Sequence, residues 1–340
     1  SLLAVARAGA GVNNIPVEQY TEQGIVVFNT PGANANAVKE LIVAGLLLGS
    51  RDIYGGMSYV QELDHMDDSG EMGKLLEKEK KRFAGSEVTG KTLGVVGLGA
   101  IGSIIANLAL DLGMDVIGYD PAISVEAAWQ LSSRVERMES LEKLLASADF
   151  VTLHVPAIPA TKHLINHETL SGMKSTAKIL NFAREEIVNT DDMVDALETG
   201  SIAGYISDFP TPALLGRKNV LLMPHIGAST AEAEENCAVM AADQLKDFLE
   251  NGNIYNSVNY PPTKMSRNGG SRITFSNNNV PKVLGSVLSI LADSEINVVD
   301  MVNKSRGEIA YNIIDVEGDI STQLKEKIAQ VDGVMRVRLL

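Results

Sequence analysis

The fold of this chain can be inferred from one stretch, Lys91-Thr92-Leu93-Gly94-Val95-Val96-Gly97-Leu98-Gly99-Ala100-Ile101-Gly102. Residues 93–96 form the short apolar run of a buried strand, and residues 101–112 carry apolar residues at helical spacing. The three glycines therefore lie at a strand-to-helix turn, where dinucleotides are bound. Gly97 permits the tight turn, Gly99 lets the backbone approach a pyrophosphate, and Gly102 lets helix and strand pack closely.

A second predicted strand, residues 115–119, supports a dinucleotide site. It ends at Asp120, eighteen residues beyond Gly102, where an acidic side chain can accept hydrogen bonds from both ribose hydroxyls. Asp120 would repel a 2′-phosphate and no arginine adjoins it, so the sequence favours NAD over NADP. The alternative is a glycine turn in an α/β protein that binds no nucleotide.

Composition limits the class of protein. A chain of 340 residues predicts two or three domains. The net charge of −14 argues against nucleic acid or a membrane surface as a partner, so an anionic substrate needs a local cationic pocket. The single cysteine, Cys237, excludes an internal disulfide, and no signal peptide or apolar span is visible. We therefore expect a cytoplasmic protein.

The first residues predict part of another α/β domain. Residues 1–6 form a buried strand with no strand before it, so we expect an N-terminal portion of this domain to be absent from the chain. Arg7 opens a glycine-rich turn at the strand's carboxyl end, facing the crevice where α/β proteins bind ligands. The alternative is a surface arginine. The next strand, residues 24–28, ends in a small polar loop, residues 29–36, that suits a carboxylate or phosphate.

Polar side chains follow three successive predicted strands, residues 178–182, 204–207 and 219–223. These side chains are Arg184, Asp208 and His225, and the carboxyl ends of parallel strands share one edge of the sheet. Hydride transfer from a 2-hydroxy acid to NAD needs a base and a cation, which imidazole and guanidinium groups supply. The alternative is a structural pairing of His225 with a neighbouring acid. We interpret His154, at another strand end, as structural.

The last seventy residues predict a separate module. Pro261-Pro262 and residues 266–271 have the composition of a linker. The expected elements that follow are a strand at 272–275, a helix at 281–294, strands at 297–304 and 308–316, a helix at 321–331 and a strand at 334–340. This βαββαβ order is ferredoxin-like, and the module lacks a base, nucleophile or metal set, so we expect it to bind or assemble.

Several motifs together resemble one family. They are residues 7–14 (RAGAGVNN), 29–34 (NTPGAN), 97–102 (GLGAIG), 181–184 (NFAR) and 224–230 (PHIGAST). On them the chain is similar to the D-isomer-specific 2-hydroxyacid dehydrogenases, in the short type with a C-terminal ACT regulatory domain. The resemblance implies oxidation of 3-phosphoglycerate to 3-phosphohydroxypyruvate with NAD, the committed step of serine synthesis.

The resemblance also implies roles for individual residues. Arg184 would be the substrate-binding catalytic arginine and His225 the acid–base, while Arg7 and Asn34 fall where the family holds substrate. Beside Gly97, Gly99 and Gly102, the expected cofactor contacts are Ala10, Ala100, Ile101, Asp120, Val155, Phe182, Ala183, Asp208, Gly227 and Ala228. No metal site is expected.

The last module matches ACT domains that bind serine as an effector. Asn279 and Asn297 match serine-binding positions, whereas Asn277 stands where a histidine often contributes. The alternative is that these asparagines cap the helix near Pro281 and close a turn. ACT modules often pair across a subunit interface, which implies a homo-oligomer, a dimer or tetramer.

The expected architecture is α/β with three domains. They are a flavodoxin-like substrate domain at 1–49 and 229–262, a doubly wound Rossmann NAD domain at 50–228 and a ferredoxin-like ACT domain at 268–340. One departure concerns the histidine: the family supplies a glutamate shortly after the position of Asp208, and residues 208–213 (DFPTPA) contain none. Glu185 or Glu186 is a hypothetical replacement.

Three other functions remain open at this stage. The first is another D-2-hydroxyacid dehydrogenase, such as a hydroxypyruvate or glyoxylate reductase. The second is a catalytically weak NAD-sensing protein, which the missing glutamate supports. The third is a nucleotide-binding scaffold whose last module only associates subunits.

Overall fold

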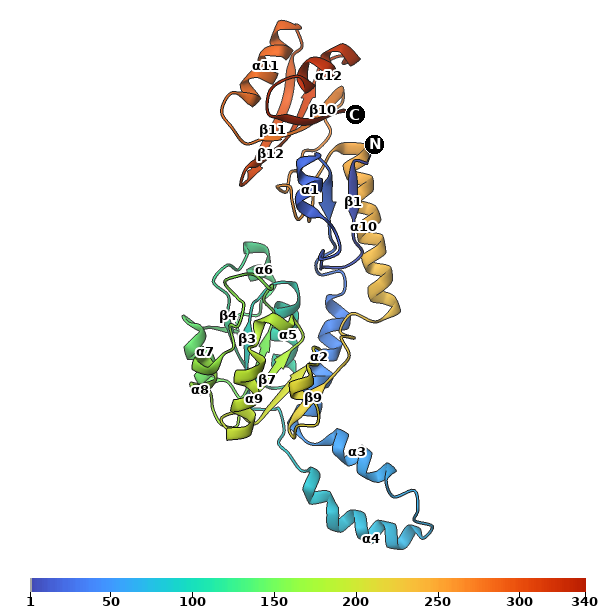
Figure 1. The fold of residues 1–340 in the computed structure, drawn as a ribbon, viewed down its shortest axis with the longest axis vertical. Coiled ribbons are helices and arrows are strands. Elements are labelled where there is room, and N and C mark those ends of the chain that lie inside the picture. Colours follow the sequence, from blue (N-terminus) through green and yellow to red (C-terminus); the bar gives the residue numbers. More distant parts are fainter. Residues whose placement is uncertain (1) are drawn as a thin grey trace. The chain divides into compact units, whose positions relative to one another are not determined.

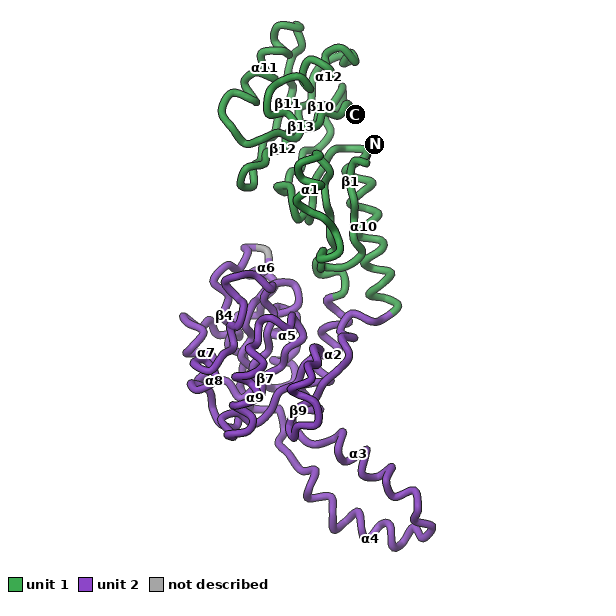
Figure 2. Tube along the Cα trace, viewed as in Figure 1, with its two compact units in different colours: residues 1–34, 231–340 green, residues 35–230 purple. Residues whose placement is uncertain are grey.

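The computed structural model describes residues 2–340, apart from the side chain of Glu126. Its contacts form two compact units, residues 35–230 and residues 1–34 with 231–340 (Figure 2). The first boundary lies at residue 34/35 instead of the expected 49/50, because α2 (Ala35–Ser50) packs on the large sheet within residues 35–230. The substrate segment and the last module, which we expected as separate domains, lie within one unit.

A seven-stranded sheet forms the centre of residues 35–230 (Figure 1). All its neighbouring strands pair in parallel. In spatial order the strands are β5 (Glu136–Arg137), β4 (Asp115–Tyr119), β3 (Thr92–Val96), β6 (Phe150–Leu153), β7 (Lys178–Asn181), β8 (Gly204–Ser207) and β9 (Val220–Leu222). The order reverses between β3 and β6, as in a doubly wound Rossmann fold, so the predicted fold class is confirmed.

Helices cover both faces of this sheet. One apolar core lies between the sheet and α2 and α5 (Ala100–Asp111). The other lies under α7 (Leu141–Ser147), α8 (His167–Ser171) and α9 (Thr190–Thr199). The remaining short elements are α6 (Val125–Gln130) and the 3-10 turns η2 (Glu185–Ile187) and η3 (Pro212–Leu214). Burial on both faces explains why the strands read as continuous apolar runs.

Two helices project from the sheet of this unit (Figure 1). They are α3 (Ile53–Gln61) and α4 (Ser69–Glu79), followed by η1 (Lys80–Phe83). Asp52 and Asp68 cap them by accepting from the N–H groups of Gly55 and Glu71. Neither helix contains a buried residue, and Tyr54 and Met57 on α3 are each 65% exposed.

The other unit begins with a short parallel sheet. Strands β1 (Ala4–Ala6) and β2 (Val26–Phe28) pair in parallel, with α1 (Val17–Glu22) between them in sequence. Helix α10 (Ala231–Asn251) packs against both strands. A sheet of two strands is too small to test whether this domain has a flavodoxin-like topology, so that topology stays a prediction.

The last module has the predicted ferredoxin-like fold. Its antiparallel sheet has the order β11-β12-β10-β13, and both helices pack on one face. The elements are β10 (Ser271–Asn278), α11 (Val283–Asp293), β11 (Val298–Arg306), β12 (Ile309–Val316), α12 (Thr322–Ala329) and β13 (Val334–Leu339). The opposite face shares a core with β2 and α10 that includes Phe28, Phe248 and Tyr311.

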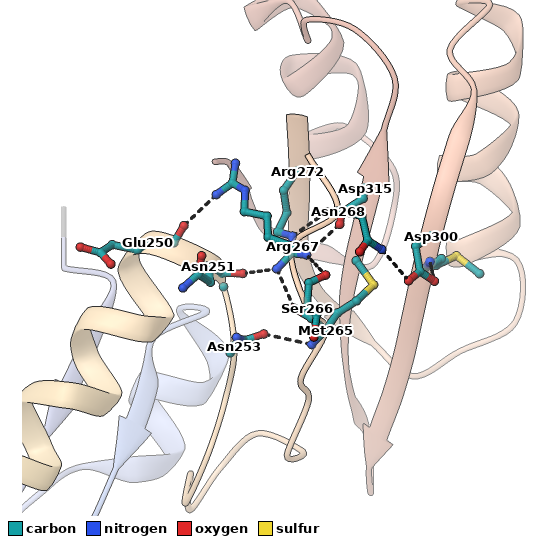
Figure 3. Close-up of polar contacts among 12 residues, drawn as sticks. Glu250, Asn251, Asn253, Met265, Ser266, Arg267, Asn268, Arg272, Asp300 and Asp315 are labelled. Atoms are coloured by element: carbon teal, nitrogen blue, oxygen red, sulfur yellow. Dashed lines mark hydrogen bonds and ion pairs between the residues drawn. The ribbon is translucent and has the colours of Figure 1, made fainter. Parts of the chain in front are cut away.

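Side chains of this module, and Arg267 just before it, donate to carbonyls at and just after the end of α10, where a helix leaves its last carbonyls without an intrahelical partner. Arg338 donates to the carbonyls of Phe248 and Leu249, and Tyr311 donates to that of Gly252, the residue after the helix. Arg267 donates to Glu250 O and Arg272 to Asn251 O (Figure 3).

Arg272 also pins the predicted linker. Its guanidinium donates to the carbonyls of Met265 and Ser266, and it forms a two-bonded ion pair with Asp315 at 2.6 and 2.8 Å (Figure 3). The two partners are 0% and 1% exposed. The segment is therefore a fixed part of the unit and not a loose tether.

No helix within residues 2–340 is long and apolar enough to cross a membrane.

Removing one partner of the Arg272–Asp315 pair should destabilise the fold strongly. Arg272→Met or Asp315→Leu alone leaves an unpaired buried charge, so we expect the free energy of unfolding in urea to fall by about 3–5 kcal/mol. The double variant should lose less than the sum, and Glu139→Gln, which breaks an exposed pair with Lys143, should lose about 1 kcal/mol or less. Losses below about 1 kcal/mol in both single variants would contradict this role.

Candidate active site

The glycine turn after β3 has the geometry that a dinucleotide requires. Gly97 has φ +90°, and a Cβ there would lie 2.6 Å from His154 O. A Cβ on Gly102 would collide with the carbonyl of Gly97, whereas a Cβ on Gly99 would meet no atom within 4 Å. The three glycines thus provide a turn, an open approach and close helix–strand packing.

The first turn of α5 offers donors to a phosphate. Gly99 is the N-cap residue and no side chain caps the helix. The N–H groups that open a helix have no intrahelical acceptor, and the helix dipole adds positive potential there. Ala100 and Ile101, both predicted cofactor residues, lie in this turn. The open space at Gly99 and these donors fit the pyrophosphate of NAD.

Asp120 ends β4 beside the same turn. Its Oδ2 accepts from Leu98 N at 2.8 Å, and its Oδ1 accepts from Ala122 N at 2.9 Å. Each carboxylate oxygen has a second acceptor site, so Asp120 can orient the turn and still accept from ribose hydroxyls. Val155 borders the turn: its Cγ1 lies 3.0 Å from the Cβ position of Gly97.

His154 is a neutral structural residue at the end of β6. Its imidazole Nε2 lies 2.9 Å from the hydroxyl of Thr152, which is fully buried. Burial of the ring lowers the pKa of His154 to about 3, although part of the residue is exposed. The ring is therefore uncharged at neutral pH, which agrees with its predicted structural role.

Asn181, fully buried at the end of β7, organises the loop that carries Arg184. Its Oδ1 accepts from Ala183 N at 3.2 Å, and its Nδ2 donates to Arg184 O at 2.9 Å and to the Tyr205 hydroxyl at 3.2 Å. The Arg184 guanidinium donates to Ala183 O at 2.7 Å. Within residues 2–340 no carboxylate pairs with Arg184, so its charge is available to an anion.

Phe182 differs from the other predicted cofactor residues because its side chain belongs to the core. The ring lies 2.9 Å from the Cβ position of Gly45 on α2, and the residue is 7% exposed. Only the backbone of Phe182 is left for a cofactor contact.

The loop after β9 carries His225, and the end of β8 holds this loop. Asp208 is 1% exposed, and its carboxylate accepts from Ile226 N at 2.8 Å and from Gly227 N at 2.7 Å. The imidazole of His225 packs on the ring of Phe209, with the centroids 4.9 Å apart. Ala228 packs against the core beneath α2.

The missing glutamate has no replacement in the part of the chain that the structure describes. No carboxylate there forms a hydrogen bond or ion pair with His225. Glu185 and Glu186 are both exposed in η2, after Arg184, and make no contact of this kind with the imidazole. The replacement hypothesis therefore finds no support in the structure.

The carboxyl edge of the sheet brings the predicted catalytic residues together. Arg184 follows β7 and His225 follows β9, the two strands that flank β8. The glycine turn follows β3 at the same edge. This edge has a dinucleotide turn, an unpaired cation and an acid–base group, the components of hydride transfer to a hydroxy acid.

The other unit holds the remaining predicted substrate and cofactor residues, Arg7, Ala10 and Asn34. Thr30, fully buried, accepts from Gly9 N at 2.7 Å and donates its own N–H to Gly9 O, and Asn29 donates to Ala10 O. These bonds join the loops after β1 and β2. Arg7 donates to the carbonyl of Gly11, and Asn34 ends the second loop partly exposed.

The predicted effector residues do not form one site within a chain. Asn279 is hydrogen-bonded to the β11–β12 hairpin: its side-chain amide donates to Gly307 O, and its backbone N–H donates to Glu308 O. The carbonyl of Asn297 accepts from Glu317 N at the opposite end of β12. Asn277 is 4% exposed and its amide is bonded to Asn278 and Asn312. The pair Asn279 and Asn297 is thus separated by the length of β12, which the sequence spacing did not reveal.

The described residues contain no cluster of three or more His, Cys, Asp or Glu side chains that could hold a metal ion.

Comparison with known proteins identifies the family. The model of the D-isomer specific 2-hydroxyacid dehydrogenase NAD binding domain matches residues 56–227. The chain belongs to the D-isomer-specific 2-hydroxyacid dehydrogenase family, and its cofactor is NAD, as predicted.

Two relatives and one solved structure illustrate the similarity. The chain is 41% identical to the D-3-phosphoglycerate dehydrogenase of Synechocystis sp. over 76% of its own length but only 45% of the relative's. It is 33% identical to the enzyme of that name from Escherichia coli, over 100% of this chain and 82% of the relative. The D-lactate dehydrogenase of Aquifex aeolicus, solved with NAD and lactic acid, superposes with TM-score 0.62 at 26% identity, covering 76% and 81% of the chains.

Gly99 and Gly102 should respond differently to alanine. Gly99→Ala adds a Cβ where the protein has open space, so the fold should be intact, but the methyl group should raise the Kd for NADH about tenfold or more. Gly102→Ala forces a collision with Gly97 and should destabilise the protein by about 1–3 kcal/mol. Fluorescence titration with NADH and thermal unfolding measure the two effects. Unchanged NADH binding in Gly99→Ala would contradict the pyrophosphate assignment.

Proposed function

We propose that this protein oxidises D-3-phosphoglycerate to 3-phosphohydroxypyruvate with NAD, a step of serine biosynthesis in the cytoplasm. The observation that carries the proposal is the placement of Arg184 and His225 at the carboxyl edge of the seven-stranded sheet. The glycine turn after β3, at the same edge, fits NAD. The name shared by the Synechocystis and Escherichia coli relatives supports the phosphorylated substrate.

When bound, NAD would supply the acceptor for the hydride on C2 of the acid. Arg184 binds the substrate carboxylate through its two-pronged guanidinium and polarises the oxygen on C2. His225 takes the hydroxyl proton as the carbonyl forms. The roles of Arg7 and Asn34 in substrate binding are part of the proposal, supported by the hydrogen bonds that order their loops.

Two other functions of the same site give different outcomes. A hydroxypyruvate or glyoxylate reductase needs no phosphate site, whereas the polar loop at 29–34 suits a phosphate. A weakly catalytic NAD sensor is favoured by one observation, the lack of a carboxylate partner for His225 among the described residues.

The test is turnover by the full chain with NAD and D-3-phosphoglycerate. Arg184→Ala and His225→Ala should each lower kcat/KM at least about 100-fold and leave the Kd for NADH within about twofold. Two variants outside the site are matched controls that should keep full activity: Arg217→Ala, at a partly exposed position paired with Glu198, and His167→Ala, at an exposed position.

The alternative functions are distinguished by which acid the protein turns over. Turnover with unphosphorylated D-glycerate alone would favour the reductase. NADH binding without turnover of either acid would favour the sensor, and in both cases the proposed substrate would be wrong.

The proposal includes a homo-oligomer that binds an amino-acid effector, serine, between copies. β11 is an edge strand that pairs with β12 in the described sheet, and most of its side chains are exposed. Antiparallel pairing of two β11 edges would bring Asn297 of one copy to the β11–β12 hairpin of the other, to which Asn279 is hydrogen-bonded. The exposed apolar residues of α3 support a second contact surface, and hence a tetramer.

Mixing two variants tests a site shared between copies. Asn279→Ala and Asn297→Ala should each abolish L-serine binding in calorimetry, because each removes one half of every site. Unfolding and refolding an equal mixture should restore about a quarter of the sites, since half of the random dimers carry one intact site. A monomer in light scattering, or no recovery on mixing, would contradict the shared site.

A further inference from the structure

We propose that Asp208 and Phe209 form a clamp that positions His225, which has no carboxylate partner among the residues that the structure describes. The clamp, defined by these two residues at the end of β8, acts on the loop after β9. Both are positioning residues, since they act through His225, and the catalytic consequence rests on the proposed function.

The carboxylate of Asp208 holds the backbone that follows His225. It is 1% exposed, and each oxygen accepts one N–H, from Ile226 at 2.8 Å and from Gly227 at 2.7 Å. A carboxylate is costly to bury unless hydrogen bonds compensate it, and such charge-assisted bonds are short and strong. A Cβ on Gly227 would lie 3.0 Å from Asp208 Oδ2, so this close approach suits glycine.

His225 needs this support because its backbone is strained. Its φ of +57° lies in the left-handed region, which costs a residue with a Cβ about 1–2 kcal/mol. Such a conformation persists only where neighbouring bonds fix it, and the two Asp208 bonds act on the next two residues. They therefore fix the direction in which the His225 side chain leaves the backbone.

Phe209 restrains the imidazole itself. Its N–H donates to Ser207 Oγ at 3.0 Å, and the residue is 9% exposed, so the ring is held. The two rings are tilted by 57° with centroids 4.9 Å apart, within the range of favourable aromatic contacts. An aromatic ring also attracts a cation, so the contact suits the protonated imidazole that forms during oxidation.

The same strand end is bonded to the loop of the catalytic arginine. Asp208 N donates to Asn181 O at 3.1 Å and Ser207 Oγ donates to the same carbonyl at 3.3 Å. The side chain of Asn181 holds Arg184. A continuous set of hydrogen bonds thus links the Arg184 loop to the clamp and, through the clamp, to the loop of His225. The clamp differs from the cofactor contact expected for Asp208, because in that contact the Asp208 carboxylate would bind NAD instead of the loop.

The test compares the full-length wild-type chain with Asp208→Asn and Phe209→Leu. Asp195→Asn, at an exposed position on α9, is the matched control. Three quantities are measured: exchange of the Ile226 and Gly227 amide protons by NMR, kcat with D-3-phosphoglycerate, and the Kd for NADH. Amide exchange needs no turnover, so it tests the clamp even if the proposed function fails.

We expect Asp208→Asn to speed exchange at least about tenfold at one or both of the two amides, because the Asn nitrogen cannot accept from an N–H and only its oxygen still can. The same variant should lower kcat and keep the Kd for NADH within about twofold. Phe209→Leu should leave exchange unchanged and lower kcat severalfold, and Phe209→Tyr should restore kcat. Should Asp208→Asn not fold, the two Phe209 variants decide.

Two results would overturn the clamp. They are unchanged exchange at both amides in Asp208→Asn, whatever its Kd for NADH, and full kcat in Phe209→Leu. If the wild-type chain turns over no hydroxy acid but Asp208→Asn loses amide protection, the clamp stands as a loop-positioning device and the proposed function fails.

Discussion

All seven strands of the large sheet run in one direction, so their carboxyl ends form one edge where the ladder stops and backbone groups need other partners. Here buried side chains supply those partners. Asn181 bonds the loop after β7, and Asp208 bonds the loop after β9. Because each loop carries one of the two proposed catalytic residues, the bonds that complete the strand ends also set the positions of Arg184 and His225.

The dinucleotide turn depends on a different constraint, which is close approach. Helix α5 can begin at the end of β3 only because Gly102 carries no Cβ to collide with the Gly97 carbonyl. That approach places the uncapped first turn at the edge of the sheet, next to open space at Gly99. Asp120 adds a bond to the turn from the neighbouring strand. The glycine turn and the two proposed catalytic residues thus share an edge because the strands are parallel.

The sequence predicted those features that depend on local pattern. Gly97, Gly99 and Gly102 have direct steric roles, and the three polar strand ends share an edge as expected. The order of the ferredoxin-like module also followed from its alternating elements. In each case the spacing of residues along a strand or helix determines the geometry.

Features that depend on contacts between distant segments could not be predicted in this way. Asn181 and Thr30 are buried polar residues whose roles appear only when their partners are seen. Phe182 faces the core because α2 carries Gly45 opposite its ring. The linker is held in place because the buried guanidinium of Arg272 donates to the linker carbonyls of Met265 and Ser266. None of these pairings leaves a periodic signal in the sequence.

NAD bound at this edge would take a hydride from C2 of a D-hydroxy acid. D-3-phosphoglycerate deuterated at C2, with NMR of the nicotinamide product, tests this transfer. We expect deuterium to arrive at C4 of the reduced ring, and we expect the L-enantiomer to transfer none. Loss of the label to solvent, or its retention at C2 while NAD is bound, would contradict this expectation.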